Sequence, residues 1–318
     1  MKIFDLHCDT VMKLIMNKDS KLSTNNFHVD IKKLKKGESL AQFFAVFLYK
    51  EAELSKYGYN TLYELSMDMI DRFFIEIEDN NEDIAFAKNI DDLNKNKKCD
   101  KISAFLSIEE GGVIGEDFYK LRNYYRLGVR LITLTWNFPN SIGFPNSKKE
   151  YMDKGLTKFG KKLIEYMNEL GIIIDVSHLS DGGFFDVSEI SGKPFIASHS
   201  NARSIQNHFR NLTDEMIEII SSSGGIIGLN FSSNFLAGGK ESKISDMIKH
   251  LKHIINIGGI DVAAIGSDFD GIRSELEIDN FGSMQKLVHE LEKNDFSLNE
   301  IEKICYKNAE RVIRDIIK

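Results

Sequence analysis

Eight short apolar segments recur along this chain, and longer amphipathic stretches or loops separate them. Each segment is only a few residues long and is often β-branched, as strands buried on both faces of a sheet are. Strands that alternate with helices predict a parallel sheet, which is either closed into a barrel or open and doubly wound. The eight expected strands are Ile3–Cys8, Phe43–Leu48, Ile102–Ile108, Leu131–Thr135, Ile172–Ser177, Phe195–Ser198, Gly225–Phe231 and Ala263–Ser267.

Several of the intervening stretches carry apolar residues at helical spacing and have helix-end signals. Thr61–Glu76 and Thr157–Leu170 are predicted helices, and Gly171 is a plausible C-terminal cap of the second. Thr213 precedes another helix start as a capping residue. A last helix that runs to Ile317 is expected after Leu298-Asn299-Glu300.

Polar residues at the ends of the expected strands distinguish a barrel from an open sheet. Five of the eight strands end in or are followed by a His, Asp or Glu, at His7-Cys8-Asp9, Glu109-Glu110, His178, His199 and Asp268. An open sheet would spread these ends along a line, whereas a closed barrel brings them together at the end where barrel active sites lie. We therefore predict an α/β fold of the (β/α)8 TIM-like barrel type with its site at the carboxyl ends of the strands.

Length and composition support one barrel and exclude several other classes of protein. The 318 residues show no internal repeat or linker, so residues 1–318 are expected to form a single metallo-hydrolase domain. A net charge of -7 provides no basic face for nucleic acid. No apolar stretch approaches the ~20 residues that span a bilayer. The three cysteines are far apart, which suits a reducing compartment, and no apolar leader precedes the first strand, so we expect a cytoplasmic protein without membrane or nucleic acid partners.

Three histidines and an aspartate have the chemistry of metal ligands. His7 and Asp9 are two residues apart, so they would share one face of a strand and form half of a divalent metal site. The alternative for this pair is a buried histidine beside an aspartate that caps a turn. His178 and His199 end consecutive strands, and imidazoles on neighbouring strands suit zinc. A single strand-end histidine is more often a hydrogen-bonded structural residue, but two in succession favour a site.

A carboxylate between the two histidine groups could bridge two metal ions. Glu110 follows an apolar strand and precedes Gly111 and Gly112, which would let the backbone turn sharply beside the metals. Glu109 is adjacent, and the pattern alone leaves the choice between the two carboxylates open. If Ile108 and Glu110 share one face of the strand, Glu109 lies on the other. We take Glu110 as the bridging and catalytic carboxylate.

Asp268 ends the last expected strand, in Gly266-Ser267-Asp268-Phe269-Asp270-Gly271. Its carboxylate could be a metal ligand, a general acid/base or an anchor for a substrate amine. Asp and Gly are also frequent in turns, and Asp270-Gly271 is expected to be such a turn. Asp268 is the better candidate for catalysis because it is closer to the strand.

Taken together, these motifs resemble the renal (membrane) dipeptidase family from the first strand to the last helix. The resemblance rests on His7-x-Asp9, Glu110-Gly111-Gly112, Asp175-x-x-His178, Ser198-His199-Ser200 and Gly266-x-Asp268-Phe269-Asp270-Gly271, in this order. It implies a barrel with two zinc ions, one held by His7 and Asp9, the other by His178 and His199, with Glu110 bridging. It also implies hydrolysis of dipeptides with tolerance of a D-residue at the C-terminal position.

The resemblance also assigns roles to residues outside the metal site. Arg210 matches the family arginine that meets the substrate carboxylate, although an ordinary surface arginine is the alternative, and Asp268 matches the residue that contacts the substrate amine or shuttles a proton. The chain departs from animal members at Trp136, where they have a histidine that helps to polarise the substrate carbonyl. Trp136 could instead wall the pocket, and Asn137 could donate a hydrogen bond. Family members are often dimers, so a homodimer is a further expectation.

The expected reaction is attack on the peptide carbonyl by a hydroxide that bridges two zinc ions, with Asp268 passing the proton to the leaving amine. Another amidohydrolase, acting on a cyclic amide or lactone, is the alternative. Such enzymes usually have His-x-His on the first strand and a modified lysine on the fourth, and His7-x-Asp9 argues against this. A binding protein on a decayed barrel is a third hypothesis, but all five candidate ligands are present.

Overall fold

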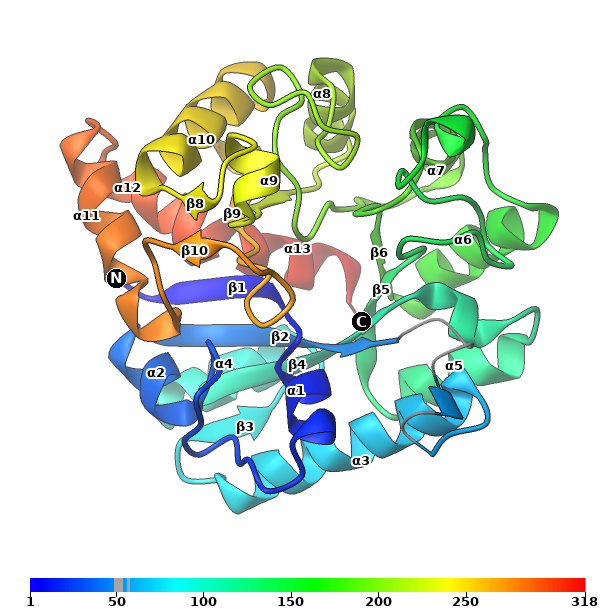
Figure 1. The fold of residues 1–318 in the computed structure, drawn as a ribbon, viewed down its shortest axis with the longest axis horizontal. Helices are drawn as coiled ribbons and strands as arrows, with labels where there is room; N and C mark the ends of the chain where they lie inside the picture. Colours follow the sequence, from blue (N-terminus) through cyan, green and yellow to red (C-terminus); the bar gives the residue numbers. More distant parts are fainter. Residues whose placement is uncertain (49–53, 56–57, 318) are drawn as a thin grey trace.

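Parallel strands form the centre of the structure (Figure 1). The computed structural model describes residues 1–48, 54–55 and 58–317. The main sheet has the order β6-β5-β4-β2-β1-β9-β7, with β3 paired to β4, and its strand pairs are parallel. The strands are β1 (Ile3–Cys8), β2 (Ser39–Phe47), β3 (Ile84–Phe86), β4 (Ile102–Glu109), β5 (Val129–Thr133), β6 (Ile173–Asp175), β7 (Ile227–Leu229) and β9 (Ala263–Ile265), and a separate two-stranded sheet contains β8 (Glu241–Ser242) and β10 (Glu275–Leu276).

The two edges of the main sheet are joined through residues 196 and 197. Ile196 forms a parallel bridge with Asp175 at the end of β6, and Ala197 forms one with Ile227 at the start of β7. All eight predicted strands therefore lie in one ring, and the prediction of a TIM-like barrel is confirmed. The sequence did not indicate β3, which lies beside the first residues of β4.

Aromatic side chains fill the amino-terminal half of the barrel. Phe4, Phe43 and Phe105 contact one another with ring centroids 5.0 to 5.9 Å apart, and all three are fully buried. Apolar side chains of α13 (Asn308–Ile316), such as Val312 and Ile316, belong to the same cluster and cover this end. Because this half is packed solid, polar chemistry is confined to the opposite end of the barrel.

Helices surround the barrel, and their ends agree with the predicted caps. The helix α3 begins after Thr61 with a capping box, and α6 begins after Thr157 and ends at Gly171, which has a left-handed backbone. Figure 1 shows α3 and α10 on opposite sides of β1 and β2. The helices are α1 (Thr10–Met16), α2 (Ile31–Lys36), α3 (Leu62–Asp79), α4 (Ile90–Lys98), α5 (Phe118–Arg126), α6 (Lys158–Leu170), α7 (Asp181–Ile190), α8 (Asp214–Ser222), α9 (Ser233–Leu236), α10 (Ile244–Gly258), α11 (Gln285–Lys293), α12 (Leu298–Glu302) and α13, with short 3-10 turns η2 (Gly111–Ile114), η3 (Lys149–Tyr151), η4 (Ile260–Val262) and η5 (Phe281–Ser283).

One continuous α-helix was expected at the end of the chain, but the structure has an interrupted one. A π-helical segment, Lys303–Lys307, separates α12 from α13. In this segment each backbone hydrogen bond spans five residues, one more than in an α-helix. Within the described residues, no helix is both long and apolar enough to cross a bilayer.

Two glycines allow the strands to approach closely below the site. A β-carbon on Gly228 or Gly266 would lie 1.9 or 1.8 Å from the carbonyl oxygen of Ser198, so neither position tolerates a side chain. The backbone that leads into His199 is thereby held close to β7 and to the residue that follows β9.

Candidate active site

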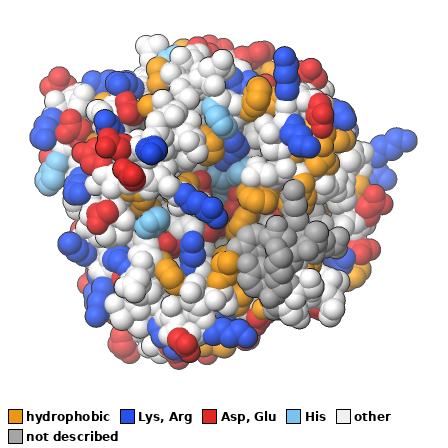
Figure 2. Space-filling model, viewed as in Figure 1, with side chains coloured by type: hydrophobic (Ala, Val, Ile, Leu, Met, Phe, Trp, Pro, Cys, Tyr) orange, Lys and Arg blue, Asp and Glu red, His pale blue; other side chains and the backbone are white. Residues whose placement is uncertain are grey.

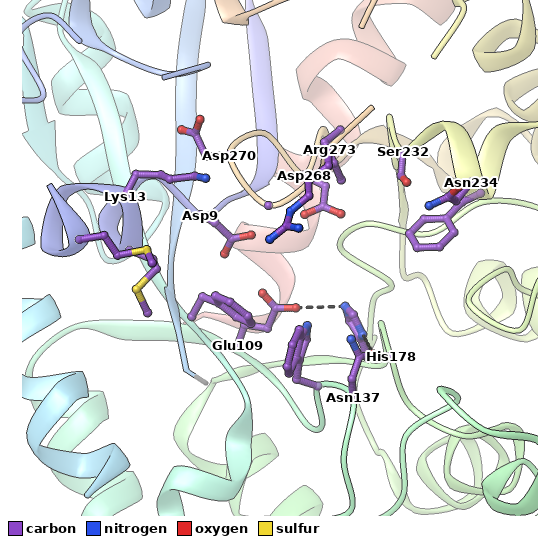
Figure 3. Close-up of a pocket in the computed structure, with 17 residues that line it drawn as sticks. Asp9, Lys13, Glu109, Asn137, His178, Ser232, Asn234, Asp268, Asp270 and Arg273 are labelled. Atoms are coloured by element: carbon purple, nitrogen blue, oxygen red, sulfur yellow. Dashed lines mark hydrogen bonds and ion pairs between the residues drawn. The ribbon is translucent and has the colours of Figure 1, made fainter. Parts of the chain in front are cut away.

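The predicted polar residues come together at the carboxyl ends of the strands. His7 lies in β1, Asp9 immediately precedes α1, His178 follows β6, His199 follows the bridge at residue 197 and Asp268 follows β9. All five side chains are buried. Figure 2 shows this face hollowed near its centre, with histidine side chains visible in the hollow. A pocket of about 440 Å³ opens there, and Figure 3 shows several of the residues that line it.

The carboxylate between the two histidine groups belongs to Glu109. Its Oε1 lies 3.0 Å from His178 Nε2 and 3.8 Å from His199 Nε2. Its Oε2 lies 3.2 Å from His7 Nε2, and that nitrogen is 3.6 Å from Asp9 Oδ1. Each oxygen of one carboxylate therefore faces a different half of the site, which is the arrangement that a bridging ligand requires.

The prediction that Glu110 takes this position is wrong. The Glu110 carboxylate turns away from the histidines and accepts hydrogen bonds from Gly112 N (2.9 Å), Trp136 N (2.8 Å) and Asn140 Nδ2 (2.6 Å). Its backbone has φ of 85°, in the left-handed region. Glu110 therefore fixes the loops beside the site and does not face the histidines.

The alternation of side chains along β4 explains this correction. Phe105 packs in the barrel interior, whereas Leu106 and Ile108 pack in the outer core against the helices. Because successive side chains of a strand point to opposite faces, Glu109 shares the inner face with Phe105, and the strand ends at Glu109. The sequence indicates only that Glu109 and Glu110 point to opposite faces; the packing of Ile108 in the outer core shows that Glu109 is the inner one.

Hydrogen bonds fix the tautomers of the two histidines that end consecutive strands. Ser198 Oγ donates to Asp175 Oδ2 (2.6 Å), so it accepts from His199 Nδ1–H at 2.8 Å. His178 Nδ1–H donates to Asn137 Oδ1 at 3.1 Å. Both Nε2 atoms are therefore unprotonated, and they face each other at 3.0 Å. Two nitrogen ligands of one tetrahedral zinc, each at about 2.0–2.1 Å, would lie at a similar separation of about 3.3 Å.

Matching aspartate–serine pairs hold two of the strand ends. Asp175 Oδ1 accepts from Ser198 N at 2.8 Å, while its Oδ2 accepts from Ser198 Oγ. Asp5 holds Ser267 in the same way, at 2.8 Å to N and 2.6 Å to Oγ. Each serine immediately precedes a site residue, His199 or Asp268. The two buried carboxylates therefore orient site residues without entering the site themselves.

Replacing Ser198 by Ala tests this positioning. The Nδ1–H of His199 would lose its acceptor, and we expect zinc affinity to fall by about 10- to 100-fold. Thr133→Ala is the matched control, because Thr133 Oγ1 donates to Asp175 Oδ2 at 2.6 Å but does not contact His199. Zinc titration against a competing chelator measures both variants. Equal affinities in the wild type and in Ser198→Ala would disprove the role of the serine.

Charges and burial adapt the site to a cation. Burial, followed by the positive charges of His7 and Arg210, holds the pKa of His178 and of His199 well below the usual range. Burial also raises the pKa of Glu109 to about 8. Burial would lower the pKa of His7, but the charges of Glu109 and Asp9 outweigh it and hold that pKa well above its usual value. Binding of a divalent cation at Glu109 would therefore release protons from this pair.

Unsatisfied buried atoms support a metal site in the same place. His7 Nε2, Asp9 Oδ1 and Glu109 Oε2 are buried without a hydrogen-bond partner among the described residues. Leaving such atoms unpaired is costly, so a ligand that binds all of them is expected. Two overlapping groups could hold a cation, His7 with Glu109 and His199, and His7 with Asp9 and Asp268. Imidazole and carboxylate ligands suit zinc.

Asp268 lies within the site, next to His7 and Asp9, as predicted. Its Oδ2 accepts a hydrogen bond from Asn230 Nδ2 at 2.8 Å, and burial raises its pKa to about 6. Asp268 and His178 both have positive φ, of 62° and 68°. Such backbone strain in residues other than glycine is frequent at functional sites. Asn230 was not predicted from the sequence, because its neighbours Leu229 and Phe231 are apolar.

Arg210 lies next to the site rather than among the residues that line the pocket. Its guanidinium donates to Ser200 Oγ (3.2 Å) and to the carbonyl oxygen of His199 (3.1 Å). It also lies 5.3 Å from the ring centroid of Phe235, which does line the pocket. The side chain is buried, so the alternative of an ordinary surface arginine is wrong.

Trp136 and Asn137 both line the pocket. The Trp136 ring packs edge-on against Phe47 and Phe138, with centroids 4.9 and 5.9 Å away, so it forms a wall. Asn137 contacts the site through the hydrogen bond that its side-chain oxygen accepts from His178. Whether Asn137 also donates to a substrate stays a prediction.

A parallel barrel with histidines and carboxylates gathered at its carboxyl end is typical of barrel metallohydrolases. The family model of membrane dipeptidase (peptidase family M19) matches residues 1–318, and this chain belongs to that family. The interpretation of the chain as a hydrolase that acts on peptide bonds is thereby confirmed, and the hypothesis of a non-enzymatic binding protein is not supported.

Relatives agree with this assignment. An uncharacterized dipeptidase of Schizosaccharomyces pombe is 32% identical over 290 residues, which are 85% of this chain and 69% of that protein. The crystal structure of dipeptidase AC, a metallo peptidase of family M19, has a TM-score of 0.91 at 24% identity and covers 100% of this chain and 99% of its own. A metallo peptidase from Rhodobacter sphaeroides, liganded with a phosphinate mimic of the dipeptide L-Ala-D-Ala, has a TM-score of 0.91 at 23% identity over 99% of both chains. At these identities the two structures show a shared fold.

Proposed function

We propose that this protein hydrolyses dipeptides, including L-Xaa-D-Xaa pairs, with two zinc ions held at the carboxyl end of the barrel. His7 and Asp9 would hold one ion, His178 and His199 the other, and Glu109 would bridge them. The observation that carries the proposal is the placement of the two Glu109 oxygens, one toward His178 and one toward His7, at 3.0 and 3.2 Å. The zinc ions would polarise the peptide carbonyl and bring the pKa of water toward neutrality.

The side chains beside the metal ligands would orient the substrate and move the proton. Asn230 occupies Asp268 Oδ2, which leaves Oδ1 to take a proton from the attacking water and pass it to the leaving amine. The Trp136 wall would exclude water from one side of the substrate.

Arg210 would bind the C-terminal carboxylate of the substrate. Its guanidinium donates to Ser200 Oγ and to the carbonyl oxygen of His199, it forms no ion pair with a carboxylate among the described residues, and its Nε is buried without a partner there. Burial also lowers the pKa of its guanidinium. A buried cation that contacts only neutral acceptors is costly, so an anionic ligand is expected to compensate it. Because Arg210 is held against the backbone of His199, a substrate carboxylate bound to it would lie at a fixed distance from the metals, which would restrict the enzyme to dipeptides.

The bound ligand of the Rhodobacter sphaeroides structure supports the substrate class. That protein holds a mimic of L-Ala-D-Ala, and its fold covers 99% of this chain. The extension of this substrate class to the present chain is part of our proposal.

An assay of amine release tests the proposed function. We expect purified protein to cleave dipeptides, including L-Ala-D-Ala, and to lose this activity on chelation and regain it with zinc. Tripeptides and dipeptide amides should be cleaved at least about 100-fold more slowly, because the carboxylate can no longer reach the buried Arg210. Metal analysis of the active protein should give two zinc per chain. Failure of the zinc-loaded protein to cleave any dipeptide would disprove the proposal and direct the search to cyclic amides and lactones.

A further inference from the structure

Two basic side chains line the pocket without an ionic partner. Lys13 lies in α1 and is half-buried, and Arg273 lies in the segment after Asp270 and is exposed. Neither forms an ion pair with any residue that the structure describes. Figure 3 shows both side chains directed toward the pocket, and Figure 2 shows basic side chains at the margin of the hollow.

The acidic side chains of the pocket are engaged elsewhere. Asp270 accepts hydrogen bonds from Thr10 Oγ1 at 2.6 Å and from His28 N at 2.7 Å. Glu109 and Asp9 face the histidines of the site, and Asp268 accepts a hydrogen bond from Asn230 Nδ2 at 2.8 Å. The positive charges of Lys13 and Arg273 are therefore available to a ligand.

Lys13 lies on the opposite side of the pocket from Arg210, whereas Arg273 is closer to Asn234, with which it also lines a smaller adjoining pocket. Arg210 stacks on Phe235, which neighbours Asn234. Figure 3 shows Asn234 across the pocket from Lys13. If Arg210 holds the C-terminal carboxylate of a dipeptide, the first residue of that dipeptide extends across the pocket toward Lys13 and passes Arg273, which lines the same pocket. Their two charges thus meet the side chain of the first residue.

We propose that the pocket selects dipeptides whose first residue has a carboxylate side chain, that is, Glu-Xaa and Asp-Xaa. This inference rests on the proposed dipeptidase function and adds a substrate class to it. The Arg273 guanidinium binds a carboxylate with two parallel hydrogen bonds, and the Lys13 ammonium adds a point charge. A neutral glutamine side chain of nearly the same shape gains neither attraction.

Matched substrates measure this selectivity. We expect kcat/KM for L-Glu-L-Ala to exceed that for L-Gln-L-Ala by about tenfold, the size expected for partly exposed ion pairs. The ratio should fall to about one in a Lys13→Met/Arg273→Met double variant, because the two substrates then differ little in interaction with the pocket. Using the ratio within each variant removes any general loss of activity. Lys18→Met is the control, because Lys18 is exposed outside the pocket, and it should keep the wild-type ratio.

Each outcome has a defined meaning. A wild-type ratio near one, or a preference for L-Ala-L-Glu over L-Glu-L-Ala, would overturn the inference while leaving the dipeptidase function intact. A wild-type preference that persists in the double variant would also overturn it and would assign Lys13 to the electrostatic support of Asp270 alone. Absence of all dipeptide cleavage would instead be a failure of the proposed function.

Discussion

Glu109→Gln is expected to lower kcat/KM by on the order of a thousandfold, whereas Glu110→Gln is expected to leave metal binding intact. The reason lies in the two carboxylates' contacts. Glu109 faces histidines from both halves of the site. A glutamine at this position has no negative charge, and its amide nitrogen cannot replace the oxygen that would contact the second metal ion. Glu110 contacts no histidine of the site and accepts three hydrogen bonds from the loops.

Metal analysis and thermal unfolding separate the two variants. Glu109→Gln should bind less than two zinc per chain. Glu110→Gln should bind the full amount but unfold at a lower temperature, because an amide nitrogen cannot accept from one of its donors, at a cost of about 1–3 kcal/mol. Full zinc content and full turnover in Glu109→Gln would disprove its assignment as the bridging ligand.

Asp268→Asn is the second substitution for which we expect a large effect. An amide cannot take up the proton of the attacking water, so kcat should fall by about 10²- to 10⁴-fold, the usual contribution of a general acid/base. The geometry around the residue should persist, because the side-chain oxygen of asparagine can still accept from Asn230 Nδ2. KM should therefore change much less than kcat.

Zinc content distinguishes the two roles that Asp268 could have. Ligand atoms of Asp268, His7 and Asp9 lie within 4.8 Å of one another, close enough to hold one cation. Two zinc per chain in the inactive variant would support the acid/base role, whereas loss of one zinc would make Asp268 a ligand. Asn230→Ala provides a comparison, because it removes the hydrogen bond to Asp268 without removing the carboxylate. Unchanged kcat in Asp268→Asn would contradict both roles.

Local patterns in the sequence predicted the barrel and most of the site. Short apolar segments with polar residues at their ends identified all eight strands of the ring. The same ends supplied His7, Asp9, His178, His199 and Asp268, which the structure brings together. This succeeded because parallel strands in a barrel all deliver their carboxyl ends to one face, so position along the chain translates directly into position in space.

Tertiary structure decided what depends on the direction of individual side chains. A shift of one residue reverses the face of a strand, so the choice between Glu109 and Glu110 required the packing of Phe105 inside and Ile108 outside the barrel. The lack of an ionic partner for Arg210 is equally invisible in the sequence, since its surroundings come from distant segments. The sequence by itself therefore determined the fold and the residue types of the site, while the three-dimensional packing determined which carboxylate joins the histidines and which cations remain free to bind a substrate.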